Sequence, residues 1–134
     1  MPLSTVPYAI VVEDDPIIMM ETVFILEDAG FRVYESFNGD EAMLHLTKHW
    51  ESTVLLFSDV DMPGSMNGFA LARHVAEHSL IEIVIASGHT CPADGDMPKK
   101  ATFLTKPFNQ RMVHEHLSQI LPDDKKPEPL KKAV

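Results

Sequence analysis

TVLLFSD, at residues 53–59, is an apolar run that ends in a serine and an aspartate. A short apolar run of this kind is typical of a strand buried on both faces of a parallel sheet. Asp59 would then lie at the carboxyl edge of the strand, where ligands bind in open α/β sheets. This one stretch therefore predicts a fold class and the position of a functional site.

Three further apolar runs also end in polar residues. They place Glu13 and Asp14 after residues 8–12, Ser87 after residues 82–86, and Lys106 after residues 102–105. Because parallel strands end at the same edge of a sheet, these side chains are expected to converge on Asp59. Acids, a hydroxyl, an ammonium and a candidate nucleophile at one edge indicate metal-assisted phosphoryl transfer onto Asp59.

Segments with helical periodicity alternate with the strands. Asp15-Pro16 reads as an N-cap followed by proline at the first helical position, and Asn38 with Glu41 reads as a capping box. The expected helices cover residues 16–29, 39–50, 69–78 and 109–121, and a less buried strand covers residues 31–35. Five strand–helix repeats with short connections predict an α/β fold with a doubly wound, five-stranded parallel sheet sandwiched by helices.

Two segments depart from the alternation. Between Ser87 and Ala101, prolines and a glycine leave little room for a regular helix, so the fourth helix is expected to be short or missing. From Pro122 onward the chain is polar and rich in proline, which predicts a disordered tail. The sequence is therefore divided into a domain at residues 1–121 and a tail at residues 122–134.

Composition narrows the classes of function. The chain has 134 residues, a net charge of −9 and only 11 lysines and arginines, which argues against nucleic-acid binding. Its apolar stretches are too short to span a membrane, and residues 1–5 lack the features of a signal peptide. The single cysteine, Cys91, allows no disulfide framework, so the cytoplasm is the expected location.

A phosphoryl acceptor at Asp59 needs positive charge nearby, because two anions repel each other. Mg²⁺ prefers hard oxygen ligands, and Glu13, Asp14 and Asp59 would supply them. Lys106 would contribute a cation and Ser87 a hydroxyl donor to the transferring oxygens.

These residues, in this order, resemble the receiver domain of two-component response regulators, in the single-domain, CheY-like, flavodoxin-like form. Met62-Pro63 and Lys106-Pro107-Phe108 match the loop signatures of that family. The resemblance implies an Mg²⁺ site with a phosphoacceptor, and it extends over nearly the whole folded length. Its implied residues are the acidic pair Glu13 and Asp14, the phosphoacceptor Asp59, the metal-binding backbone carbonyl of Asp61, the switch residues Ser87 and Phe103, and Lys106.

The resemblance also implies partners. A histidine kinase or histidine phosphotransfer protein would donate the phosphoryl group, and the signal would leave through contact with a downstream protein, unless the domain is a phosphate shuttle or sink. The protein would catalyse only its own phosphorylation and slow autodephosphorylation. Many relatives dimerise through the helix that precedes the position of Phe103. Because that helix is expected to be short or missing in this chain, a monomer or weak dimer is expected. The Lys106–Pro107 peptide is expected to be cis.

Two other functions compete with this reading. Asp59-Val60-Asp61 matches the nucleophile pattern of haloacid-dehalogenase phosphatases, but that fold places the pair after its first strand and leaves Glu13 and Asp14 unexplained. A receiver that binds partners without phosphorylation is the second alternative, and the complete set of acids and Lys106 disfavours it. Taken alone, Asp59 could also be an ordinary helix cap or turn residue.

Overall fold

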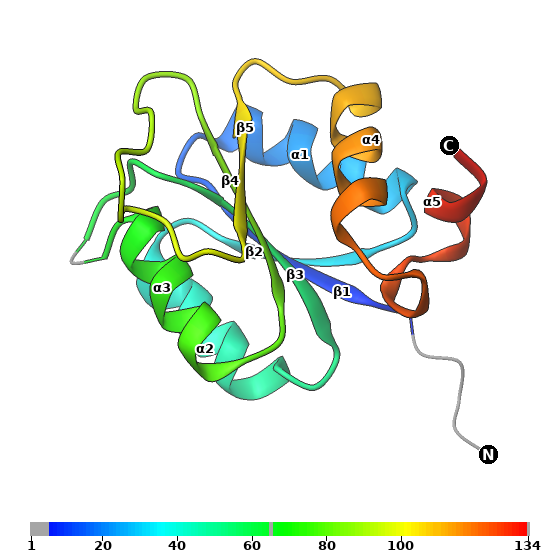
Figure 1. Ribbon diagram of the computed structural model, residues 1–134, viewed down its shortest axis with the longest axis horizontal. Helices are drawn as coiled ribbons and strands as arrows, with labels where there is room; N and C mark the ends of the chain where they lie inside the picture. Colours follow the sequence, from blue (N-terminus) through cyan, green and yellow to red (C-terminus); the bar gives the residue numbers. More distant parts are fainter. Residues whose placement is uncertain (1–5, 65, 134) are drawn as a thin grey trace.

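A computed structural model describes residues 6–64 and 66–133 of the chain. Five strands form one parallel sheet in the order β2-β1-β3-β4-β5 (Figure 1). The strands are β1 (Tyr8–Val12), β2 (Arg32–Ser36), β3 (Thr53–Asp59), β4 (Glu82–Ser87) and β5 (Ala101–Thr105). The predicted parallel sheet is therefore confirmed, with β3 at its centre.

Helices cover both faces of this sheet. In Figure 1, α1, α4 and α5 lie on one side and α2 and α3 on the other. The bounds are α1 (Pro16–Asp28), α2 (Gly39–His49), α3 (Gly68–His78), α4 (Gln110–Ile120), the 3-10 turn η1 (Asp123–Lys125) and α5 (Glu128–Ala133). Within the described ranges, none of these helices has the length and apolar character needed to cross a membrane.

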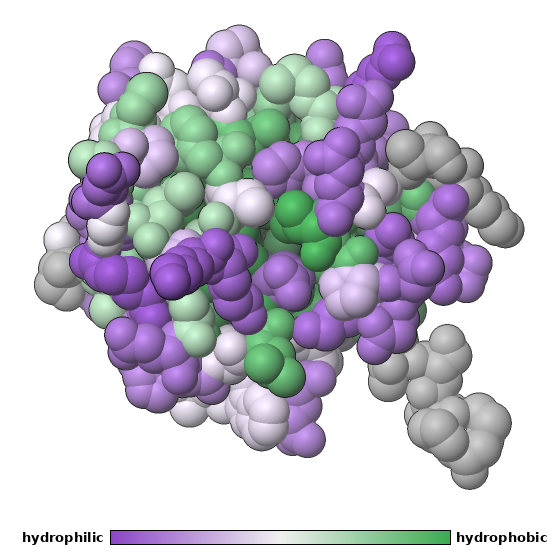
Figure 2. Space-filling view, in the orientation of Figure 1, coloured by the Kyte–Doolittle hydropathy of each residue, from purple (hydrophilic) through white to green (hydrophobic). Residues whose placement is uncertain are grey.

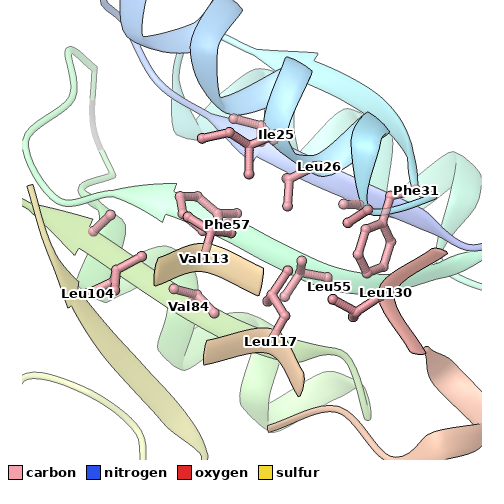
Figure 3. Packing of buried hydrophobic residues seen from close by; sticks show 14 of the residues in the cluster. Ile25, Leu26, Phe31, Leu55, Phe57, Val84, Leu104, Val113, Leu117 and Leu130 are labelled. Atoms are coloured by element: carbon pink, nitrogen blue, oxygen red, sulfur yellow. The ribbon is translucent and has the colours of Figure 1, made fainter. Parts of the chain in front are cut away.

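Each central strand sends alternate side chains into two separate cores. On β3, Leu55 and Phe57 point to the core under α1 and α4, whereas Leu56 points to the core under α2 and α3. All three side chains are buried. Figure 3 shows the first core, in which Leu26 of α1 and Leu117 of α4 meet the side chains of β3. The unbroken apolar run at residues 54–57 therefore reflects burial on both faces of the sheet.

Polar caps start the helices at the positions that the sequence predicts. The Asp15 carboxylate accepts hydrogen bonds from the backbone N–H groups of Ile17 and Ile18, at 2.9 and 3.3 Å. The Asn38 side chain accepts from the N–H of Glu41 at 2.9 Å. The Glu41 carboxylate reaches back one residue further than a simple capping box requires, to the N–H of Phe37 at 2.6 Å.

The segment between β4 and β5 forms no helix. Residues 88–100 are all described and run through turns and bends, which confirms the expectation for the fourth helix. The Arg73 guanidinium of α3 holds the far end of this loop by donating to the carbonyl of Asp96 at 2.7 Å. Figure 2 shows hydrophobic and hydrophilic residues interspersed on the face that carries β5 and this loop.

The C-terminal segment contradicts the expected disordered tail. Residues 123–133 form η1 and α5, and Leu130 is fully buried in the core beside Leu55 and Phe31 (Figure 3). The polar, proline-rich composition conceals this one apolar anchor, because a single leucine has no periodicity to reveal it. The folded domain therefore extends beyond residue 121.

The tail docks where the backbone turns from α1 into β2. Gly30 has a positive φ of 106°, and a Cβ atom there would lie 2.6 Å from the Cβ of Pro127 and 2.8 Å from the Cδ of Pro129. Glycine both adopts this left-handed conformation easily and leaves room for the two prolines.

We predict that Leu130→Ala lowers the free energy of unfolding by about 2–5 kcal/mol, because it removes a fully buried side chain and leaves a cavity. Urea unfolding followed by circular dichroism measures this loss. Leu80→Ala is the matched control, since Leu80 is 81% exposed and the chemical change is the same. Equal stabilities for the two variants would mean that α5 does not pack on the core.

Candidate functional site

The carboxyl ends of β1, β3, β4 and β5 line one cleft. Its volume is about 620 Å³, and its lining includes residues that immediately follow or end these strands. The members predicted from the sequence are Glu13, Asp14, Asp59, Asp61, Ser87 and Lys106. The parallel arrangement thus brings together residues that are up to 93 positions apart in the chain.

Lys106 connects three strands at this edge. Its Nζ lies 2.7 Å from Oε1 of Glu13 and 3.2 Å from Oδ1 of Asp59. The side chains of Lys106, Glu13 and Asp59 are only 16%, 5% and 11% exposed. Water therefore screens this ammonium weakly from the two carboxylates, and the three groups act as one charged unit.

Burial dominates the electrostatics of the two acids. It raises the pKa of Glu13, against the opposing hydrogen bond from Lys106, and it raises the pKa of Asp59, against the attraction of the same ammonium. For Lys106, burial lowers the pKa but the contacts with Glu13 and Asp59 outweigh it, so the pKa is raised. Ionised carboxylates are thus held at a cost, which a bound cation would offset.

Three acids at this edge form a group suited to a hard cation. One carboxylate oxygen each from Glu13, Asp14 and Asp59 lies within 4.8 Å of the others. Within this group, Glu13 is buried, whereas Asp14 is exposed to solvent. Oxygen ligands that include a solvent-facing carboxylate fit Mg²⁺, which binds through few carboxylates and keeps several waters.

Ser87 ends β4 inside the cleft and is 3% exposed. Its Oγ accepts hydrogen bonds from the backbone N–H groups of His89 and Thr90, at 3.3 and 3.1 Å. Its carbonyl accepts from the N–H of Lys106 at 3.0 Å, which ties the ends of β4 and β5 together. The serine therefore organises the start of the β4–β5 loop and lines the same cleft as the acids.

Two features of the site escaped the sequence reasoning. Thr90 Oγ1 donates to Oδ2 of Asp61 at 2.9 Å, which joins the loop after β4 to the loop after β3. A Cβ atom on Gly68 would lie 2.0 Å from the carbonyl oxygen of Asp59, so the start of α3 approaches β3 too closely for any side chain. The Asn67-Gly68 pair signals such a helix start, whereas nothing local in the sequence pairs Thr90 with Asp61.

Phe103 lies apart from the polar group. It is half-buried on β5 and packs against the core under α2 and α3, and it does not line the cleft. Phe108, by contrast, lines the cleft and packs edge-on against Phe57, with ring centroids 5.5 Å apart. The Lys106–Pro107 peptide between these two aromatics is cis, as the sequence resemblance predicts.

Comparisons with known proteins agree with this fold. The Response regulator receiver domain model matches residues 9–118. The receiver protein CpdR of Brucella abortus is 34% identical over 113 residues, which cover 81% of this chain and 92% of CpdR. The Aerobic respiration control protein ArcA of Escherichia coli K12 is 28% identical over 108 residues, or 78% of this chain. This chain covers only 44% of the length of ArcA.

Among solved structures, the chemotaxis response regulator CheY4 of Vibrio cholerae superimposes with a TM-score of 0.75 at 28% identity. That match covers 87% of this chain and 100% of CheY4. The receiver domain of the hybrid histidine kinase CckA gives a TM-score of 0.73 at 26% identity, over 86% of this chain and 99% of that domain. With a family match that spans most of its folded length, this chain belongs to the response regulator receiver domain family.

Proposed function

We propose that Asp59 accepts a phosphoryl group from a histidine kinase or histidine phosphotransfer protein. The observation that carries the proposal is the position of Lys106 between Glu13 and Asp59, beside a third carboxylate. A nucleophilic carboxylate, a cation-binding acid pair and a fixed ammonium are the parts that phosphoryl transfer requires.

In the proposed reaction, a carboxylate oxygen of Asp59 bonds to phosphorus while the bond from phosphorus to the donor histidine nitrogen breaks. The electron pair of the broken bond returns to the imidazole of the donor. Mg²⁺ held by Glu13, Asp14, Asp59 and the carbonyl of Asp61 would neutralise charge on the phosphoryl oxygens. Nζ of Lys106 already lies 3.2 Å from Oδ1 of Asp59, so it could contact the negatively charged phosphoryl oxygens without a large movement.

Ser87 is proposed to donate a hydrogen bond from its hydroxyl group to a phosphoryl oxygen. Its Oγ already accepts from two loop N–H groups, so a change at Ser87 would reach the β4–β5 loop directly. Phe103 is the proposed aromatic switch residue: its packing against the core would change together with the β4–β5 loop. The signal would then pass to a downstream protein that contacts the surface formed by the β4–β5 loop and β5. Alternatively, the domain would serve as a phosphate shuttle or sink.

CpdR supports the proposal that this chain acts alone, because the match covers 92% of that protein. A monomer or weak dimer fits a β4–β5 segment that has no helix to present. The cytoplasm is the proposed location. The protein would catalyse only its own phosphorylation and slow autodephosphorylation. Haloacid-dehalogenase chemistry is disfavoured, because Asp59 ends the third strand of the chain in a receiver-family fold.

We predict one Mg²⁺-dependent phosphoryl adduct on the wild-type protein after incubation with acetyl phosphate, seen by intact mass spectrometry. Asp59→Asn should show none, because the amide lacks the nucleophilic carboxylate. Asp94→Asn, at an exposed loop position, is the matched control and should be labelled like the wild type. A folded protein without an adduct would instead be a receiver that binds partners without phosphorylation.

The raised pKa of Asp59 predicts a pH-dependent stability. Because the folded state binds this proton more tightly than the unfolded state, stability falls as pH rises through the raised pKa. In EDTA at pH 7, Asp59→Asn should therefore be more stable than the wild type, by about 1.4 kcal/mol for each tenfold tightening of proton binding.

This advantage should shrink as the pH falls below the raised pKa, where Asp59 in the wild type is protonated. Thermal unfolding between pH 4 and pH 8 measures the trend, with Asp94→Asn again as the control. A wild type more stable than Asp59→Asn at pH 7 would show that the Lys106 contact outweighs burial at this carboxylate.

A further inference from the structure

Thr90 makes two hydrogen bonds to different parts of the site. Its backbone N–H donates to Ser87 Oγ at 3.1 Å, and its side-chain hydroxyl donates to Asp61 Oδ2 at 2.9 Å. Ser87 ends β4 and Asp61 follows β3, so one residue ties the two loops that border the cleft. Thr90 itself does not line the cleft, which separates it from the groups that would touch a phosphoryl oxygen.

The side-chain hydrogen bond determines where the Asp61 carboxylate points. Asp61 lines the same cleft as Asp59, yet its carboxylate is not part of the group that Glu13, Asp14 and Asp59 form within 4.8 Å. Only the backbone carbonyl of Asp61 is a proposed cation ligand. Its exposed side chain would be free to swing toward these three acids if nothing held it.

The β4–β5 loop makes Thr90 well suited to hold that carboxylate. The loop contains no helix in residues 88–100, so its shape depends on individual contacts. Arg73 fixes the far end through Asp96, and Thr90 fixes the near end through Ser87 and Asp61. The threonine hydroxyl is therefore presented by a segment that is anchored at both ends.

From this geometry we propose that Thr90 is a positioning residue, which holds the Asp61 carboxylate outside the three-acid group and so keeps the cleft receptive to an anionic phosphoryl group. The inference rests on the proposed function. It adds Thr90 to the residues that serve this function, beside the acids, Ser87 and Lys106. Released from Thr90, the Asp61 carboxylate would add negative charge beside Asp59. Such a charge attracts a cation and repels a phosphoryl group.

Thr90→Val tests this with almost no change in shape, because it replaces the hydroxyl with a methyl group. We expect Mg²⁺ alone to bind the variant more tightly than the wild type. With saturating Mg²⁺, beryllofluoride, an analogue of the phosphoryl group, should bind more weakly. Bringing this existing unit charge several ångströms closer in partly aqueous surroundings changes each affinity by about threefold to tenfold.

Two further variants identify the cause. Thr90→Ser keeps the hydroxyl and should restore both affinities to wild-type values. In an Asp61→Asn background, Thr90→Val should change neither affinity, because the side chain it releases carries no charge. Isothermal titration calorimetry measures both ligands, and a thermal melt of each variant confirms that it is folded.

Opposite shifts for the two ligands distinguish positioning from simple loosening of the loop. If Thr90→Val weakens both Mg²⁺ and beryllofluoride, or changes neither, the inference is wrong. Failure of the wild type itself to bind beryllofluoride would overturn the proposed function instead. In that case, tighter Mg²⁺ binding by Thr90→Val that Asp61→Asn abolishes would still support the role of Thr90.

Discussion

The ammonium of Lys106 lets two carboxylates, those of Glu13 and Asp59, share one poorly solvated edge of the sheet. Without it, Glu13 and Asp59 would face each other as partly buried anions, which is costly in a region that water screens weakly. The same contacts join the ends of β1, β3 and β5, so the charge arrangement and the alignment of the strands depend on each other. Raised pKa values at both acids show that the compensation is incomplete. That residual cost suits a site proposed to bind a cation.

The scaffold around this unit is regular in the strands of the sheet and irregular in the loops that follow them. The sheet packs between two separate cores, and Gly68 lies so close to the carbonyl of Asp59 that no side chain would fit there. The loop after β4 has no helix, and single hydrogen bonds from Thr90 and Arg73 shape it instead. Changes at the site would therefore be transmitted through a few replaceable contacts rather than through a packed helix.

Most of the fold was predictable because its signals are local. Apolar runs marked the strands, and Asp15 and Asn38 marked the helix starts, since a cap lies within a few residues of the N–H groups that it serves. The packed tail was not predictable in this way. Leu130 is one apolar residue among lysines, glutamate and prolines, and its burial depends on a hollow formed by distant parts of the chain.

The sequence by itself determined the parallel sheet, the residues at its carboxyl edge and the lack of a helix in residues 88–100, between β4 and β5. These features depend on apolar runs, helix caps and prolines, which act over short distances along the chain. Only the tertiary structure decided which of those residues touch. The contacts of Lys106 with Glu13 and of Thr90 with Asp61 cross 93 and 29 positions of chain. Such pairs depend on how strands and loops pack in space, and no pattern of neighbouring residues encodes that distance.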